Sequence, residues 1–167
     1  AVNFLLKKNE KQFKNSLKKI VNLEHRLEFV GNFKNIFFYN DSKATNIESS
    51  RNAINSFKNI FWILGGRKKP GGLQGIDRSL KNIDYAFSFG ESGEEFKKYL
   101  TKKGIKSIYS DKLENVVLTA VKTALIEKKQ INIIFSPACS SFDQYKNFEH
   151  RGNKFKTLIK GIIKSAK

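Results

Sequence analysis

Short apolar runs alternate with longer segments of helical periodicity over most of this chain, and this alternation restricts the possible folds more than any other feature. The clearest helix is expected at 112–127, where apolar residues from Leu113 to Leu125 recur on one stripe. Further helices are expected at 46–58, 93–103 and 142–165, and strands at 60–64, 85–89, 107–109 and 131–135. Strands that alternate with helices of this length form βαβ units with parallel strands. The sequence therefore predicts an α/β fold, a three-layer Rossmann-like domain with a mostly parallel sheet flanked by helices.

The beginning of the chain departs from this alternation. Phe13, Leu17, Ile20 and Val21 fall on one helical face, which predicts a helix in the first 22 residues. Two strand-like runs follow at 26–30 and 36–39, and the Gly31-Asn32 pair between them is typical of a turn. A boundary between two structural units is expected near residues 22–25.

Charge is the next constraint, because the formal net charge is +17. Such a charge is typical of proteins that bind nucleic acid or an anionic membrane. The lysines, however, recur along almost the whole chain together with many Asn, Ile and Phe, as an AT-rich coding sequence would produce. We therefore expect no nucleic-acid partner and no membrane partner, although a general positive potential would attract a small anionic substrate.

Cysteine content and hydropathy indicate the compartment. Cys139 is the sole cysteine, so no disulfide can form within the chain, and a reducing environment is expected. The first residues contain no basic leader before an apolar stretch, and no apolar run has the roughly 20 residues that span a bilayer. These features predict a cytoplasmic protein.

Three predicted strands end in polar loops, and ligands of parallel sheets bind at such loops, beyond the carboxyl ends of the strands. The first loop, at 40–46, reads NDSKATN. Asp41, Lys43 and Thr45 are suited to a magnesium-linked nucleotide or another anion. Helix capping is the alternative, because Thr45 and Glu48 have the spacing of a capping box. Capping does not explain Lys43, so both interpretations stay open.

The second loop, at 64–72, combines glycines with the three cations Arg67, Lys68 and Lys69. Glycines let the backbone approach a ligand closely, and the cations favour an anionic ligand. The loop is not the phosphate-binding loop of nucleoside triphosphatases, because Gly72 stands where that motif requires lysine. A flexible basic surface turn explains these residues equally well.

The third loop, at 136–144, reads SPACSSFDQ. Ser141 and Gln144 have capping-box spacing, which predicts that a helix begins here and offers its N-terminus to a carboxylate or phosphate. A capped helix without a ligand is the alternative. Cys139 is expected to be a packed thiol, because neither histidine has a spacing that implies a catalytic dyad. Two His and one Cys give no zinc-ligand pattern, so no metal site is expected from this chain.

Three segments, taken in order and separation, carry a family resemblance: His25-Arg26-Leu27-Glu28, NDSKATN at 40–46, and SPACSSFDQYKNFEHRGNKF at 136–155. Together they resemble the C-terminal domain of the bacterial Mur ligases, in particular those that add D-glutamate. The resemblance runs from about residue 20 to the end of the chain. It implies that residues 1–22 are the terminal helix of a preceding central domain and that 23–167 form the C-terminal domain.

The family resemblance also implies an activity. Such enzymes join D-glutamate to UDP-N-acetylmuramoyl-L-alanine in cytoplasmic peptidoglycan synthesis. ATP phosphorylates the terminal carboxylate of the nucleotide substrate, and the amine of D-glutamate then attacks the acyl phosphate. ATP and Mg²⁺ would be bound mainly by the central domain, over which the C-terminal domain closes to complete the site and exclude water.

The same resemblance assigns roles to individual residues. Arg26 and Lys43 would be the catalytic cations that contact phosphate groups, and Asp41 would contact the ribose of the nucleotide. A D-glutamate pocket would be formed by a cation, hydroxyl groups and aromatic rings, namely Thr45, Lys69, Ser141, Phe142 and Phe148. Lys68 is adjacent to Lys69, so the pocket lysine could be either of the two.

Departures from the family pattern define further expectations. The hinge reads Asn22-Leu23-Glu24-His25, where the family usually has Gly-Leu-Pro-His. The phosphate-binding Gly-Lys-Thr/Ser loop, the modified lysine that helps to hold magnesium and the uracil-binding domain of the family have no counterpart in the 167 residues, so this polypeptide alone is expected to fold but not to turn over. Two other hypotheses remain: another Mur-type or folylpolyglutamate-type ligase with a different amino acid, and a basic nucleic-acid-binding module.

Overall fold

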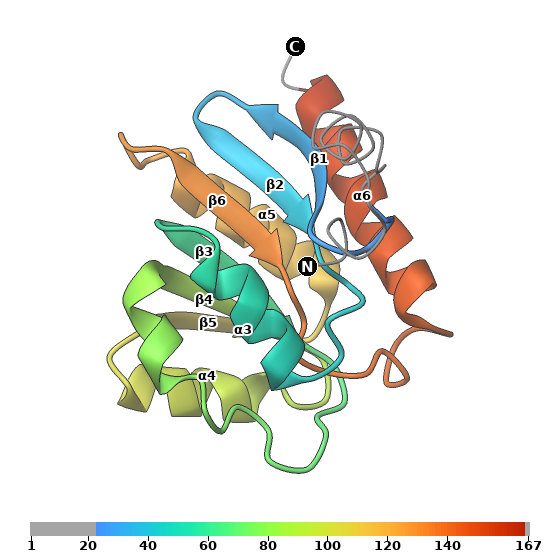
Figure 1. Ribbon diagram of the computed structural model, residues 1–167. Helices are drawn as coiled ribbons and strands as arrows, with labels where there is room; N and C mark the ends of the chain where they lie inside the picture. The colour runs from blue at the N-terminus through green and yellow to red at the C-terminus, as the bar shows by residue number, and fades with distance from the viewer. Residues whose placement is uncertain (1–22, 166–167) are drawn as a thin grey trace, which may run out of the picture.

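The computed structural model describes residues 23–165, which form a six-stranded sheet with helices on both faces (Figure 1). The strands are β1 (Glu28–Phe33), β2 (Ile36–Asn40), β3 (Ile60–Gly65), β4 (Ile83–Phe89), β5 (Lys106–Ser110) and β6 (Ile131–Phe135). The helices are α3 (Ile47–Asn55), α4 (Gly93–Lys102), α5 (Leu113–Ala124) and α6 (Phe148–Ser165), with a 3₁₀ segment η1 (Asp77–Asn82). The helix predicted in the first 22 residues, and the separate unit proposed there, lie outside the described residues.

The strand order is β1-β2-β6-β3-β4-β5, and every neighbouring pair is parallel except β1 with β2. The predicted fold class is therefore confirmed. Strand β6, late in the sequence, lies between β2 and β3, so the loops that follow these three strands meet at one edge of the sheet. That edge is the place where parallel sheets bind ligands.

Two apolar layers explain why the strands read as continuous hydrophobic runs. Phe61 and Ile63 of β3 face a core cluster that includes α5 and α6, while Trp62 and Leu64 face a second cluster with α3, η1 and α4. Figure 1 shows α3 and α4 on one side of the sheet and α5 and α6 on the other. Because both faces are covered, the central strands lose the polar alternation of a half-exposed sheet.

The first hairpin corrects the turn prediction. β1 continues through Gly31 and Asn32, and the turn falls at Lys34-Asn35, where Lys34 has a left-handed φ of 53°. Gly31 instead lies at a register shift of β1 against β2, and a Cβ on it would come within 3.1 Å of the Ile163 side chain. The glycine therefore allows α6 to pack closely on the strand, which the sequence pattern did not distinguish from a turn.

The start of the last helix was also predicted wrongly. Ser141 does not begin a helix, because its carbonyl accepts the amides of Gln144 and Tyr145 in an isolated turn. α6 begins at Phe148, and the Asn147 side chain accepts the amide of His150 at 2.7 Å as its cap. Twelve residues therefore separate β6 from α6, and they form the loop that follows β6. Within residues 23–165, no helix is both long and apolar enough to span a bilayer.

Candidate functional site

The loop after β2 is attached to the segment before β1 by a buried carboxylate. Asp41 accepts the Leu27 amide at 3.1 Å through Oδ1 and the Ser136 hydroxyl at 2.7 Å through Oδ2. Because its proton is donated to Asp41, the Ser136 hydroxyl accepts from the Ser50 hydroxyl of α3 at 2.9 Å. Burial raises the pKa of Asp41 to about 6, although both hydrogen bonds and nearby Arg26 oppose that shift. Asp41 thus joins four segments of the chain at the edge of the sheet.

The segment that carries Arg26 has an unusual backbone. His25 and Leu27 both adopt left-handed φ values, 63° and 46°, which cost non-glycine residues energy. Hydrogen bonds hold this conformation: the His25 amide donates to Glu28 at 3.0 Å, and the His25 carbonyl accepts the Lys43 amide at 3.0 Å. Arg26 and Lys43 are therefore fixed next to each other by their backbones, while both side chains are exposed.

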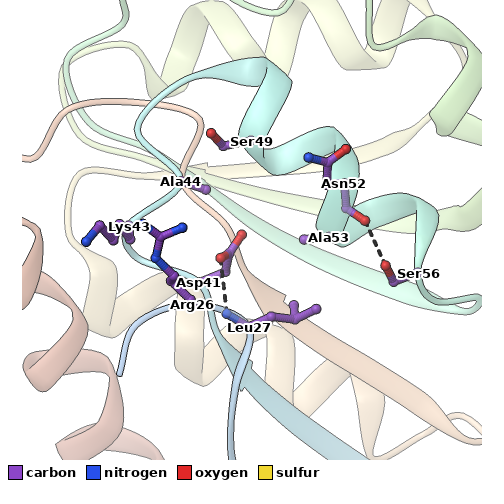
Figure 2. Close-up of a pocket in the computed structure, with 9 residues that line it drawn as sticks. All are labelled: Arg26, Leu27, Asp41, Lys43, Ala44, Ser49, Asn52, Ala53 and Ser56. Carbon is purple, nitrogen blue, oxygen red and sulfur yellow. Dashed lines mark hydrogen bonds between the residues drawn. The ribbon is translucent and has the colours of Figure 1, made fainter. Parts of the chain in front are cut away.

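Arg26, Asp41 and Lys43 surround one cavity of about 270 Å³ (Figure 2). The opposite wall is formed by polar residues of α3 and its C-terminus, and the cavity is lined by Arg26, Leu27, Asp41, Lys43, Ala44, Ser49, Asn52, Ala53 and Ser56. Two cations beside a set of hydroxyl and amide groups suit a ligand that combines an anionic group with hydrogen-bonding groups. The structure therefore brings together the three residues predicted to contact a nucleotide.

Phe148 joins this group from α6. The Lys43 Nζ atom lies 5.1 Å from the centroid of the Phe148 ring, and the His25 ring packs edge-on against it at 6.0 Å. A cation at this distance from an aromatic face is attracted to it. The predicted pocket residue Phe148 thus lies beside the predicted phosphate contact Lys43 rather than in a separate site.

The capping alternative for Thr45 is wrong. Asn46 is the N-cap of α3, and its side-chain oxygen accepts the Ser49 amide at 2.9 Å. Thr45 precedes the cap and is half-buried, so its hydroxyl is not used to begin the helix. Thr45 therefore stays a candidate for ligand binding.

The loop after β3 is fastened to the loop after β6. Arg67 and Ser140 exchange backbone hydrogen bonds of 3.1 and 3.0 Å, which form an isolated antiparallel bridge. Gly66 makes this contact possible, because a Cβ on it would lie 2.3 Å from the Ser140 carbonyl oxygen. The two loops that carry the predicted pocket residues Lys69 and Ser141 are therefore held together by backbone hydrogen bonds.

Lys68 and Lys69 have different surroundings. Lys68 forms an ion pair with Glu95 of α4, and its amide donates to the Ser92 hydroxyl at 3.0 Å. Lys69 lines a hollow of about 240 Å³ that also contains Asn46 and Ala138, and a neighbouring cavity of about 500 Å³ against α4. Both lysines therefore line the cavity against α4, but of the two it is Lys69 that also lines the hollow beside the loops after β2 and β6.

Two of the other predicted pocket residues differ in solvent exposure. Ser141 is buried at 2% exposure, and Phe142 is 66% exposed. The structure does not bring Lys69 into the cavity that Arg26 and Lys43 line. Neither that cavity nor the hollow around Lys69 is lined by Thr45, Ser141, Phe142 or Phe148. Among residues 23–165, no group of three or more His, Cys, Asp or Glu side chains is arranged to hold a metal ion.

Sequence reasoning missed Arg151. This residue of α6 is fully buried, and its guanidinium donates to Ser42 and Cys139 in two of the site loops. A signal was present, because Arg151 stands at helical spacing from Phe155 and Ile159, on the face that packs into the core. A cation on an apolar helix face requires an internal partner.

Comparison with known proteins supports the family resemblance. The family model described as Mur ligase, glutamate ligase domain, matches residues 25–139. A UDP-N-acetylmuramoylalanine–D-glutamate ligase of Wolbachia pipientis wMel is 41% identical over 148 residues, which is 89% of this chain and 29% of that protein. The protein of the same name from Rickettsia felis is 37% identical over 161 residues, or 96% of this chain and 36% of its own length.

Solved structures share the fold at low sequence identity. The UDP-N-acetylmuramate–alanine ligase of Thermotoga maritima matches 96% of this chain with a TM-score of 0.63 and 14% identity, over 35% of its own chain. The bifunctional folylpolyglutamate synthase/dihydrofolate synthase of Yersinia pestis matches 90% with a TM-score of 0.51 and 15% identity, over 34% of its own chain. The chain spans about a third of the length of the curated relatives named above. On the family model and these relatives, the chain belongs to the Mur ligase family, as a member of its glutamate ligase domains.

Proposed function

We propose that this chain is the C-terminal, D-glutamate-binding domain of an ATP-dependent, ADP-forming ligase that adds D-glutamate to UDP-N-acetylmuramoyl-L-alanine in peptidoglycan synthesis. The observation that carries the proposal is the arrangement of Arg26, Asp41 and Lys43 around one cavity, in a chain whose curated relatives are named D-glutamate ligases. A cytoplasmic location belongs to the same proposal, because peptidoglycan precursors of this kind are assembled there.

In the proposed reaction, Arg26 and Lys43 offset the negative charge that gathers on the phosphate groups of ATP and of the acyl phosphate. Their positions support this role, since both side chains are exposed and line the same cavity. Asp41 lines the cavity too and would contact the ribose. Because both of its carboxylate oxygens already accept internal hydrogen bonds, Asp41 also keeps Arg26 and the loop after β6 in place.

The proposed D-glutamate pocket consists of Thr45, Lys69, Ser141, Phe142 and Phe148. A dicarboxylate needs a cation and hydroxyl or backbone donors, and this set supplies the Lys69 ammonium and the hydroxyls of Thr45 and Ser141. Lys69 is preferred to Lys68 as the pocket cation, because Lys68 is paired with Glu95 on the side of α4. When the amine of the amino acid attacks the acyl phosphate, these contacts would hold the amino acid in position.

Magnesium does not fit the described part of this chain as a resident ion, since residues 23–165 hold no suitable cluster of ligands. ATP, Mg²⁺ and UDP-N-acetylmuramoyl-L-alanine would be bound mainly by upstream central and N-terminal domains. We therefore expect the 167-residue chain alone to release no phosphate from ATP.

The decisive experiment measures phosphate release by the chain with its upstream domains restored. ATP, Mg²⁺ and UDP-N-acetylmuramoyl-L-alanine are supplied with D-glutamate, L-glutamate or meso-diaminopimelate as acceptor. Release with D-glutamate alone, lost in Lys69→Ala and retained in the matched control Lys68→Ala, is expected. Release with a different acceptor would leave the ligase mechanism in place and show that the amino-acid pocket is assigned wrongly. Absence of release with every acceptor would refute the proposed activity.

A further inference from the structure

Arg151 is a buried cation that the proposed reaction does not use. It lies one turn into α6, with 0% of its side chain exposed. Nε donates to the Ser42 hydroxyl at 3.1 Å, Nη2 to the Ser42 carbonyl at 2.8 Å, and Nη1 to the Cys139 carbonyl at 3.0 Å. All three nitrogen atoms of the guanidinium therefore donate hydrogen bonds to Ser42 or Cys139.

These contacts fall on the loops that carry the proposed site. Ser42 stands between Asp41 and Lys43, and Cys139 precedes Ser141 by two residues. The loop after β3 is held indirectly, because Cys139 is followed by Ser140, which forms the backbone bridge to Arg67. A single side chain thus connects the loops after β2 and β6 and, through the backbone bridge, the loop after β3.

The contacts continue to the first turn of α6. The Ser42 hydroxyl, which accepts from Arg151, donates to the Phe148 carbonyl at 2.8 Å. Phe148 in turn packs against the Lys43 ammonium and the His25 ring. The position of Lys43 therefore depends on Arg151 from two sides, through the adjacent Ser42 and through Phe148.

Stability alone is a poor explanation for an arginine at this place. None of its three acceptors is a carboxylate, so the direct contacts that offset the cost of burying the charge are neutral groups and the Phe135 ring, 5.9 Å away, with Asp143 acting on the charge without a hydrogen bond. Burial lowers the pKa of Arg151 to about 10, and the group stays charged at neutral pH. An apolar side chain would pack with Phe155 and Ile159 at less cost, but it would leave the two loop carbonyls without donors.

We propose that Arg151 is a positioning residue, which holds the three site loops in one arrangement and does not itself touch a ligand. The identity of the ligands that these loops would bind rests on the proposed function. The positioning of the loops by Arg151 does not depend on it. Because only a guanidinium has donors in three directions on a planar frame, lysine should not replace it.

The first arm of the test uses the chain alone and needs no ligand. Amide hydrogen exchange is compared for the unmodified chain, Arg151→Lys, Arg151→Ala and the control Lys154→Met, which removes a partly exposed cation of the same helix. In both Arg151 variants the amides of Lys43, Arg67 and Ser140 should exchange at least about ten-fold faster, while amides of β3 and β4 change much less. Methylguanidinium should restore slow exchange in Arg151→Ala only.

Equal acceleration of loop and strand amides would show that Arg151 merely supports the core, and unchanged loop amides would show that it positions nothing. If Arg151→Ala does not fold, Arg151→Lys and its comparison with Lys154→Met still decide between these outcomes. If neither variant folds, the residue is structural and the proposal is overturned.

The second arm measures D-glutamate ligation with the upstream domains restored. Arg151→Lys should lower kcat/KM by at least about ten-fold, with a raised KM for D-glutamate, because a misplaced pocket loses binding and alignment together. Arg151→Ala should regain activity with methylguanidinium. An inactive unmodified protein would contradict the proposed function without touching the exchange result, whereas an active protein unaffected by Arg151→Lys would contradict the positioning role.

Discussion

The amide nitrogen of Asn40 donates a hydrogen bond to Nδ1 of His25 at 2.9 Å. The direction is fixed, because the same amide nitrogen also donates to Glu28 at 3.0 Å and the Asn40 oxygen accepts the Ser42 amide at 3.2 Å. His25 must therefore be unprotonated at Nδ1, and its ring is only 3% exposed. The residue next to the proposed phosphate contact Arg26 is thus a neutral imidazole in the folded protein.

Acid should weaken the fold through His25. Burial, and then the charge of Lys156, lower the pKa of His25 below its usual 6.5. Below pH 6.5 the unfolded chain binds a proton that the folded chain excludes, so this contribution to stability is complete above pH 6.5 and is lost as pH falls. Urea unfolding at pH 7.5 and 5.0 should show a smaller loss for His25→Asn, which tolerates the left-handed backbone, than for the unmodified chain. His150→Asn, at an exposed histidine, is the control and should leave the loss unchanged.

Asp41 should act in the opposite direction over a lower range of pH. Its pKa is raised from 3.8 to about 6, so between these values the folded chain binds more protons than the unfolded chain. The free energy of unfolding contributed by this group therefore falls as pH rises from about 4 to 6, and is fully lost above that range. For a pKa change of this size, the free energy of unfolding should decline by roughly 1–3 kcal/mol between pH 4 and 7 through this group. Asp41→Asn should abolish this decline. A decline of the same size in Asp41→Asn would assign it to other carboxylates.

Gly66 should tolerate no side chain. A Cβ there would lie 2.3 Å from the Ser140 carbonyl oxygen, with a φ of 121°. Gly66→Ala should lower the free energy of unfolding by about 2–4 kcal/mol, because the clash adds to the backbone strain. Gly104→Ala is the matched control: its φ of 85° imposes strain, but no atom lies within 4 Å, so about 1 kcal/mol is expected. Equal losses of unfolding free energy in the two variants would mean that the loops can move apart to accept the Cβ at little energetic cost.

Lys156 should couple α6 to the segment that carries Arg26. Its ammonium lies 3.1 Å from both Glu24 and Glu28, and the Lys156 and Glu28 side chains are only 13% and 19% exposed. A double-mutant cycle with Lys156→Met and Glu28→Gln should give a coupling of about 1 kcal/mol, since the pair is shielded from solvent. The exposed pair Lys98–Glu94 is the control and should couple much more weakly. Indistinguishable couplings would mean that the hinge segment is not held by this contact.

The sequence predicted the central architecture well, because buried parallel strands and the apolar stripe of α5 leave unambiguous patterns. It failed where one residue type serves two purposes. Gly31 was interpreted as a turn, yet it permits close packing of Ile163, and the spacing of Ser141 and Gln144 is equally compatible with the isolated turn that the structure contains.

The sequence could name the residue types of the candidate site on its loops, but not the contacts among them. Asp41, Lys43 and Lys69 could be named from motifs, whereas their distribution over two separate hollows depends on how the loops pack in three dimensions. Arg151 could have been singled out as a cation on an apolar helix face, although its acceptors are backbone carbonyls that no sequence pattern identifies.

The backbone bridge between Arg67 and Ser140 also limits how the proposed amino-acid pocket can be redesigned. The stretches around Lys69 and Ser141 are about seventy residues apart in the chain, yet each sets the path of the other. If one stretch alone is replaced by that of a relative, its backbone need not match the remaining stretch, and the bridge between positions 67 and 140 would be lost. An exchange that keeps the bridge has to move both stretches together with Gly66.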